Sequence, residues 1–286
     1  MPTNLSFAEH GAGIGAAASV VRANAVSAGL AAPVPPCPGW TVLDLVLHVG
    51  LAHRWATAVL DGLPQAQWPT DESVRAEGLR SGDVLDWFDD GMVRLLQVLT
   101  GSPEDLQAFF FLKDAPPPRD AWARRQCHET TIHGVDTMAA RMRRLPQAAE
   151  TWIRPELAAD GVDELLRGFV PRRSGRVRTA PGQPPYAVRV QAIDIDRAWT
   201  MRVSADPVVT TTGSRTQEAQ PSPQTQPSPE TGGEPHGIPA VVLEGTAAQL
   251  YLGLWNRGEE FTAAGEGSAV AEFLALWRRD QRIEWS

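Results

Sequence analysis

Residues Ala123–Asp136 read ARRQCHETTIHGVD, and this stretch decides how the first half of the chain is interpreted. It holds two histidines, a glutamate, an aspartate and one of the chain's 2 cysteines, a dense group of candidate metal ligands. The surrounding segment, about Asp120 to Arg144, has the pattern of a helix. The interpretation therefore depends on which of these side chains share one helical face.

Successive helical residues turn by about 100°. Glu129 and His133 are four apart and lie on one face, and Asp136 continues the same stripe. His128 precedes His133 by five residues, so it lies off that face, and the HExxH arrangement of zinc proteases is excluded. Cys127 points nearly opposite to Glu129 and is expected to be a buried or half-buried thiol.

Two ligands rarely complete a transition-metal site, so a third is expected from another helix. His48 is the best candidate, because it stands among apolar residues in a predicted helix, whereas His53 lies on a different face. His48, Glu129 and His133 would form a 2-His-1-carboxylate set, which suits Zn²⁺ with an open position and also Fe²⁺, Ni²⁺ or Mn²⁺. The spacing leaves an alternative open, in which these are hydrogen-bonded structural histidines and a surface Glu–His pair.

The first 150 residues are predicted to form a helical bundle, an architecture that often holds metals between facing helices. One helix start is well marked, because Thr41 is a candidate N-cap and Asp44 is the acidic residue three positions on. Trp87, Leu95, Leu96 and Leu99 are expected to face inward from the third helix. The predicted helices cover Ser6–Leu30, Thr41 to near Gly62, Ser81–Thr100 and about Asp120 to Arg144.

After Pro146 the pattern changes to a mixture of helices and strands. Residues with period-two alternation predict half-buried strands. The predicted strands are Tyr186–Ile193, Trp199–Val203 and Ala240–Leu243, and the predicted helices are Pro155–Phe169, Ala247–Trp255 and Ala269–Arg279. The fold class is therefore predicted as α+β, with a four-helix bundle over residues 1–150 and a small α+β domain over 151–286.

The second domain is interrupted at about residues 210–237, a segment rich in Pro, Ser, Thr, Gln and Gly. It has almost no large apolar side chains, so burial cannot offset the entropy lost on ordering. We expect a disordered insert there.

Composition narrows the function classes. The net charge of −8 argues against nucleic acid as a partner, since phosphate binding needs clustered positive charge. No apolar run reaches the length of about 18 to 20 residues that a membrane span needs. With 2 cysteines in 286 residues there is no disulfide framework, so a reducing cytoplasm is expected.

Two stretches of the first half, PGWTVLDLVLHVGLAHRWA (38–56) and WARRQCHETTIHGVD (122–136), together resemble the mycothiol-dependent maleylpyruvate isomerase family. That family is actinobacterial and belongs to the DinB-like metal-binding four-helix bundles. Three later stretches resemble its C-terminal domain: LAADGVDELLRGFV (157–170), IDRAWTMRV (195–203) and LEGTAAQLYLGLWNRG (243–258). The resemblance spans nearly the whole chain except the insert.

The resemblance implies roles for five residues. His48, Glu129 and His133 fall on the positions that bind a divalent metal, usually zinc, in the family. Asp136 falls on an aspartate that is expected to orient His133 or a helix neighbour. Arg54 falls in the HRWA element, where it is expected either to contact an anionic substrate or to have a structural role. No residue is assigned to binding of mycothiol, the family's thiol cofactor.

The implied function is a mycothiol-dependent metalloenzyme, acting as a monomer or homodimer. A metal-activated thiol would attack a small electrophile, giving isomerisation or transfer of the thiol. Two other classes remain open: a metal-dependent hydrolase, and a non-catalytic metal-binding or regulatory module.

Overall fold

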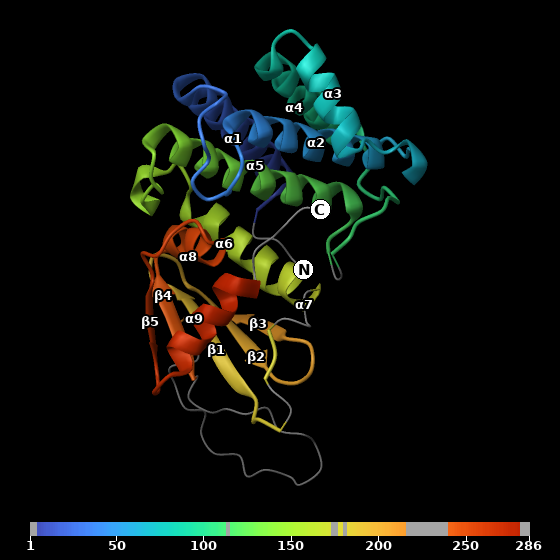
Figure 1. Ribbon diagram of the computed structural model, residues 1–286. Coiled ribbons are helices and arrows are strands. Elements are labelled where there is room, and N and C mark those ends of the chain that lie inside the picture. Colours follow the sequence, from blue (N-terminus) through green and yellow to red (C-terminus); the bar gives the residue numbers. More distant parts are fainter. Residues whose placement is uncertain (1–4, 113–114, 173–176, 180–181, 216–239, 281–286) are drawn as a thin grey trace. The chain divides into compact units, whose positions relative to one another are not determined.

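A computed structural model describes residues 5–112, 115–172, 177–179, 182–215 and 240–280 of the chain (Figure 1). The chain divides into two compact units, Met1–Trp152 and Ile153–Ser286. The first unit is helical, and the second combines helices with a sheet, so the predicted α+β class is confirmed.

Four long helices form the bundle of the first unit, as predicted. Helix α5 packs against α1 and α2, and α2 also packs against α4 (Figure 1). The short helix α3 follows a 3₁₀ turn at Gln65–Gln67 and was not predicted from the sequence. The bounds are α1 Phe7–Ala28, α2 Val42–Leu60, α3 Asp71–Arg80, α4 Val84–Gly101 and α5 Pro118–Met142.

Capping residues fix where these helices begin. Thr41 and Asp44 form the predicted capping box at the start of α2, and Ser6 forms another with Glu9 at the start of α1. Asp83 caps α4, so this helix begins slightly later than the predicted Ser81. The start of α2 matters for the site, because it sets the position of His48 along the bundle.

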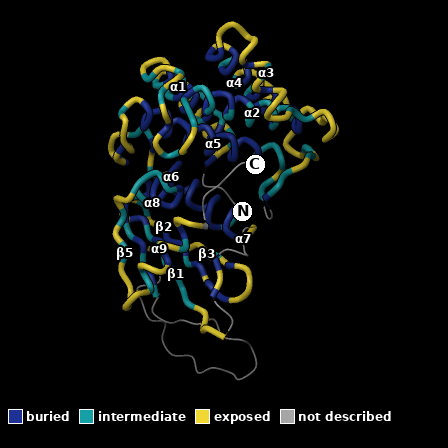
Figure 2. The backbone as a smooth tube through the Cα atoms, viewed as in Figure 1, coloured by how far each residue is buried: buried dark blue, intermediate teal, exposed yellow. Residues whose placement is uncertain are grey.

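Helix α5 is buried along its length, from Ala121 to Ala140 (Figure 2). Close approach of α1 is possible because Gly13 has no side chain; a Cβ there would collide with the Cys127 sulfur. Cys127 is therefore the buried thiol that the sequence predicted. On α4, three of the four residues expected to face inward are buried, whereas Leu96 is only half-buried.

The second unit begins with helix α6 (Pro155–Asp163), which continues through a π-helical turn, η3 (Glu164–Phe169), into α7 (Val170–Arg172). In the described residues five strands form one sheet in the order β3-β2-β1-β4-β5. Strands β1 and β4 are parallel, and the other neighbouring pairs are antiparallel. Helix α8 packs on α6 and the sheet, and α9 packs on β4 and β5 (Figure 1). The bounds are β1 Tyr186–Ala192, β2 Arg197–Val203, β3 Val209–Gly213, β4 Val241–Gly245, β5 Thr262–Gly265, α8 Ala247–Leu254 and α9 Ala269–Asp280.

Strands β3 and β5 were not predicted, and β3 corrects the start of the expected insert. Residues 210–213, placed in the disordered segment from the sequence, pair with β2, with Thr212 opposite Trp199. A run of β-branched threonines fits a strand once a neighbouring edge is available. Residues 216–237 of the expected insert lie outside the described residues. Among the described helices, none has the length and apolar character needed to cross a bilayer.

Candidate metal site

Helices α2 and α5 bring His48, Glu129 and His133 together. One ligand atom from each side chain lies within 4.8 Å of the other two. Glu129 Oε1 is shared between the histidines, 3.2 Å from His48 Nε2 and 3.3 Å from His133 Nε2. We call these three residues the His–Glu–His cluster. The sequence prediction of their convergence agrees with the structure, while metal binding itself stays a prediction.

Glu129 is held in place from its other oxygen. Arg125, one turn earlier on α5, donates from Nη2 to Glu129 Oε2 at 3.1 Å, which leaves Oε1 facing the two histidines. Burial would raise the pKa of Glu129. Hydrogen bonds from His133 and His48, together with the charges of His133 and Arg125, instead hold this pKa well below its usual range. The carboxylate is therefore ionised at neutral pH.

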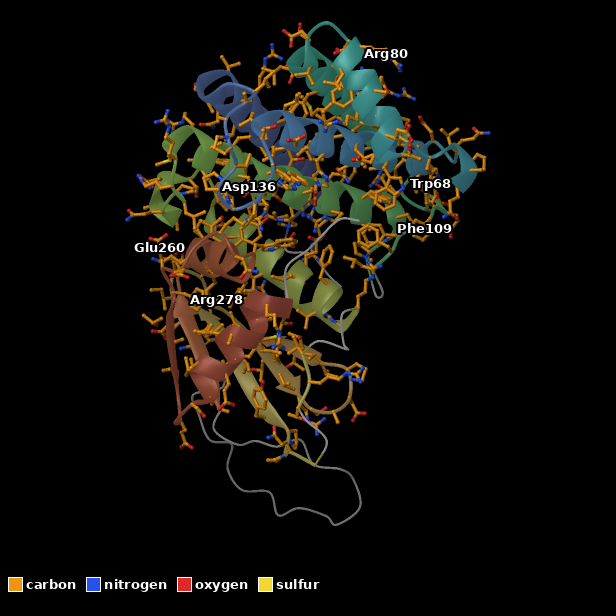
Figure 3. All side chains as sticks on the ribbon, in the orientation of Figure 1. Trp68, Arg80, Phe109, Asp136, Glu260 and Arg278 are labelled. Carbon is orange, nitrogen blue, oxygen red and sulfur yellow. The ribbon has the colours of Figure 1, made fainter. Side chains whose placement is uncertain are left out.

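His133 is oriented by Asp136, which lies one turn later on α5 (Figure 3 labels Asp136). His133 Nδ1 is 2.9 Å from Asp136 Oδ2, so Nδ1 carries the proton and Nε2 faces Glu129. Burial opposes the charged form of His133, but hydrogen bonds to Asp136 and Glu129 raise its pKa to about 9. The surroundings of this ring thus stabilise positive charge, as a cation site requires.

The loop before α2 covers the cluster. The Trp40 ring lies 4.9 Å from the His48 ring and is stacked 6.3 Å from the His133 ring, measured between centroids. Cys37 donates from Sγ to Asp136 Oδ2 at 3.5 Å. The half-buried side chains of Trp40 and Cys37 therefore form one wall of the site and restrict the access of water to it.

Arg54 was expected either to contact an anionic substrate, as a catalytic residue, or to have a structural role, and its contacts in the structure lie away from the His–Glu–His cluster. Its guanidinium lies 3.7 Å from the centroid of the Trp87 ring, and Nη2 donates to the Trp87 carbonyl at 2.9 Å. Nη1 donates to the Gly50 carbonyl at 3.3 Å, and Nε lies 3.4 Å from Glu77 Oε1. These contacts join α2 to α3 and α4 rather than to α5. The geometry supports the structural role that the sequence left open, not contact with substrate.

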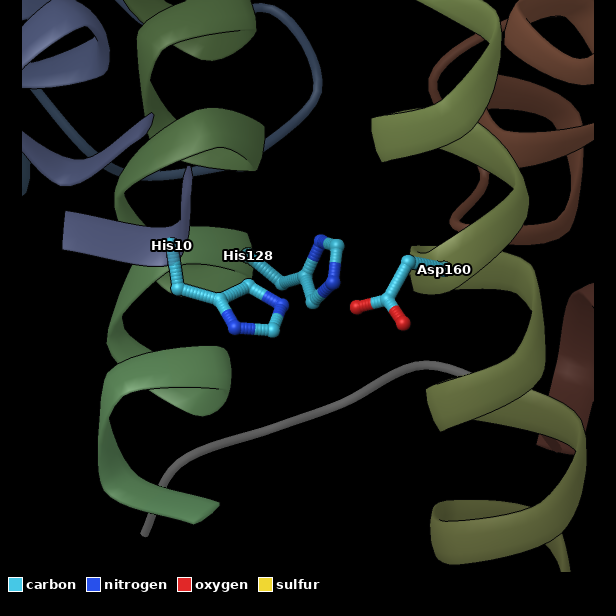
Figure 4. A group of neighbouring side chains, drawn as sticks. All are labelled: His10, His128 and Asp160. Atoms are coloured by element: carbon cyan, nitrogen blue, oxygen red, sulfur yellow. The ribbon is translucent and has the colours of Figure 1, made fainter. Parts of the chain in front are cut away.

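The other histidines of the first unit stand outside the cluster. His53 Nε2 is 2.9 Å from Thr130 Oγ1, and burial lowers the pKa of His53 to about 3, so this ring is neutral. His128, expected to lie off the ligand face, meets the ring of His10 edge-on with centroids 6.4 Å apart (Figure 4).

Two residues of the site escaped the sequence prediction. Arg125 carried a usable signal, because an arginine four residues before a glutamate lies on the same helical face. Residue spacing gives no signal for Trp40, because its position over the two histidines depends on the path of the proline-rich loop. Asp136 was expected to orient His133 or a helix neighbour, and in the structure it is hydrogen-bonded to His133.

The donor set fits a divalent cation. Two imidazole nitrogens and one carboxylate oxygen converge, a combination that binds zinc and related metals. The outer partners fit as well, since a ligating histidine usually donates its other N–H to a carboxylate, as His133 does to Asp136. Three protein ligands leave a coordination position for a further molecule.

The fold and the cluster together define a two-unit protein, a four-helix bundle with a buried His–Glu–His cluster followed by an α+β unit. The family models described as the mycothiol maleylpyruvate isomerase N-terminal domain and the MDMPI C-terminal domain match residues 11–137 and 156–272. The chain belongs to the mycothiol-dependent maleylpyruvate isomerase family, as its resemblance indicated.

Two crystal structures share the fold. Both are of mycothiol-dependent maleylpyruvate isomerase, one of them a His-to-Ala mutant. Each is 14% identical to this chain and covers 93% of it and 98% of its own length, with TM-scores of 0.58 for the mutant and 0.59 for the other. A comparison with curated proteins finds no match.

Proposed function

We propose that the chain is a metal-dependent enzyme that uses mycothiol to attack a small electrophile, giving isomerisation or transfer of the thiol. One observation carries the proposal: His48, Glu129 and His133 converge within 4.8 Å in a chain of this family. The two crystal structures that share its fold are of mycothiol-dependent maleylpyruvate isomerase, which supports the use of mycothiol and isomerisation.

The three cluster residues would hold a divalent cation, and two imidazoles with one carboxylate are a donor set that suits zinc. A bound cation lowers the pKa of a thiol near it, which is the chemistry it would supply to mycothiol. Glu129 provides the negative charge that balances the cation, and Arg125 keeps its Oε1 directed at the histidines. Asp136 accepts the Nδ1 proton of His133, so that a bound cation would take the place of the proton on Nε2.

The wall formed by Trp40 and Cys37 serves the same chemistry. Excluding water strengthens electrostatic interactions within the site and protects a thiolate from solvation. Cys37 and Cys127 are both thiols, which agrees with a reducing compartment such as the cytoplasm, where a low-molecular-weight thiol stays reduced.

The test is metal analysis of the purified full chain, followed by titration with mycothiol. We expect about one equivalent of metal in the wild type and loss of it in His48→Ala. The matched control is His53→Gln, on the same helix but bonded to Thr130, which should keep its metal. Equal metal content in His48→Ala and wild type would contradict the proposal.

The titration separates the two other function classes. Bound metal without affinity for mycothiol would favour a hydrolase, in which the cation activates water. A wild-type chain that takes up no metal would favour a non-catalytic module.

A further inference from the structure

Six aromatic side chains gather near one end of the α2–α5 pair, and the proposed function gives them no role. The Trp55 ring on α2 packs edge-on against Trp122 on α5, with centroids 5.0 Å apart, and stacks on Phe111 at 5.8 Å. Trp68 and Phe109 extend the group toward the surface, 5.4 Å apart (Figure 3). We call the group the aromatic cluster; its members are Trp55, Trp68, Phe109, Phe110, Phe111 and Trp122.

The aromatic cluster lies on the same seam as the His–Glu–His cluster. Trp55 is seven residues after His48 on α2, and Trp122 is seven residues before Glu129 on α5. Seven residues return a helix to nearly the same face and advance it by about 10 Å. Both cross-helix pairs, His48 with Glu129 and Trp55 with Trp122, are in contact, so the two clusters lie along the same interface of the antiparallel helices.

This group differs from the apolar core of the bundle. Phe88 in the core is fully buried, whereas Phe109 is 48% exposed and neighbouring Leu63 is 41% exposed. The exposed members are nevertheless held in place. Trp122 donates from Nε1 to the Phe109 carbonyl at 2.9 Å, and Trp68 donates from Nε1 to the Leu63 carbonyl at 2.9 Å. The Trp122 ring is fully buried, so the accessible ring surface of the group belongs to Phe109 and, in part, to its four half-buried members.

We propose that the aromatic cluster binds a planar apolar ring carried by the electrophile, so that the substrate class is an aromatic electrophile rather than a small polar acid. The inference rests on the proposed function for its reactive centre. Offset or edge-on ring contacts at 4.5–7 Å are favourable, and a ligand ring inserted among these side chains would gain them. The two clusters are about 10 Å apart along the helices. A thiol sulfur at the His–Glu–His cluster, the carbon that it attacks and one aromatic ring on that electrophile would span this distance.

The experiment compares N-phenylsuccinimide with N-methylsuccinimide, two probes that differ only in the ring and have no double bond to react with a thiol. Binding to the full chain is measured by calorimetry. We expect the phenyl compound to bind about tenfold more tightly or better. Trp55→Leu and Phe111→Leu should each reduce that preference about three- to tenfold, because a ring contact is lost.

A partly exposed aromatic of the second unit provides the matched control, and Phe261→Leu should leave the preference unchanged. If thermal melting shows that Trp55→Leu or Phe111→Leu does not fold, Phe109→Ala, at a half-exposed position, is used in its place. Equal binding of the two probes to the wild type would overturn the inference. So would a preference that survives the loss of these rings, because the cluster would then only seal the end of the bundle.

The outcome is separate from that of the metal test. Succinimide binding requires neither metal nor mycothiol, so a chain without metal can still show the ring preference. A metal-binding chain without that preference would keep the proposed function and lose this inference.

Discussion

Helix α2 carries two buried polar regions, the His–Glu–His cluster facing α5 and the surroundings of Arg54 facing α3 and α4. The Arg54 guanidinium lies over the Trp87 ring and donates hydrogen bonds to two backbone carbonyls. In the cluster, three ligand atoms from separate side chains meet at one place. The comparison teaches that convergence of donor atoms, more than burial of charge, distinguishes a site from a structural contact.

The largest effect is expected from Glu129→Gln, which tests the cluster side of the comparison. Replacing the shared carboxylate by a neutral amide should lower zinc affinity by more than about 100-fold, beyond the range typical of outer partners. Competition with a chromogenic chelator measures it. Glu77→Gln, the same change beside Arg54, is the control and should leave zinc affinity unaltered. If Glu129→Gln binds zinc as tightly as the wild type, the His–Glu–His cluster is no more a metal site than the Arg54 region is.

A smaller loss is expected from Asp136→Asn, which leaves all three cluster residues in place. The carboxylate that accepts the Nδ1 proton of His133 is lost, so the ring is held less firmly and its Nε2 is a weaker donor to a cation. Zinc affinity should fall about 10- to 100-fold, and the melting temperature of the metal-free chain should fall too, because a buried charge-assisted hydrogen bond is lost. If the variant binds zinc as the wild type does, Asp136 does not act through His133.

Arg54→Met should change stability rather than metal binding. The variant keeps an unbranched apolar side chain but leaves the Trp87 carbonyl without the donor and removes the cation–π contact. We expect the free energy of unfolding in urea to fall by about 2 kcal/mol.

The outcome for Arg54 decides between its two sequence-based roles. Unchanged zinc affinity is expected, because its contacts lie on α2, α3 and α4. If Arg54→Met keeps wild-type stability but loses turnover, Arg54 has the catalytic role, and its region is a functional site like the His–Glu–His cluster.

The sequence was sufficient for the bundle because local signals agreed there. The Thr41–Asp44 capping box fixes the start of α2, and helical spacing then fixes the faces of His48 and Glu129. The same rule places Arg54 on another face of α2 than His48. Six residues beyond His48 amount to about 240° around the helix, so the two side chains cannot share a face.

What the sequence could not supply depends on partners distant in the chain. The run Val209–Gly213 has little apolar character and becomes a strand because β2 offers it an edge. Trp40 reaches the histidines through a loop whose path no periodicity describes. The aromatic cluster likewise gathers residues from α2, α5 and two connecting loops, and only the seven-residue spacings were visible in the sequence.

Cys37→Ala should have the smallest effect, and it tests the edge of the cluster. Sγ is 3.5 Å from Asp136 Oδ2, a contact made by a weak donor, and neither of the two groups of potential metal ligands in the described residues includes Cys37. Removing the thiol should change zinc affinity by no more than about threefold, since Asp136 keeps its stronger hydrogen bond with His133. A loss as large as that of Glu129→Gln would instead make Cys37 a fourth ligand. Cys37 would then fill the coordination position that we propose for the thiol of mycothiol. The cluster would resemble the Arg54 region, in which protein groups already contact every polar atom of the guanidinium.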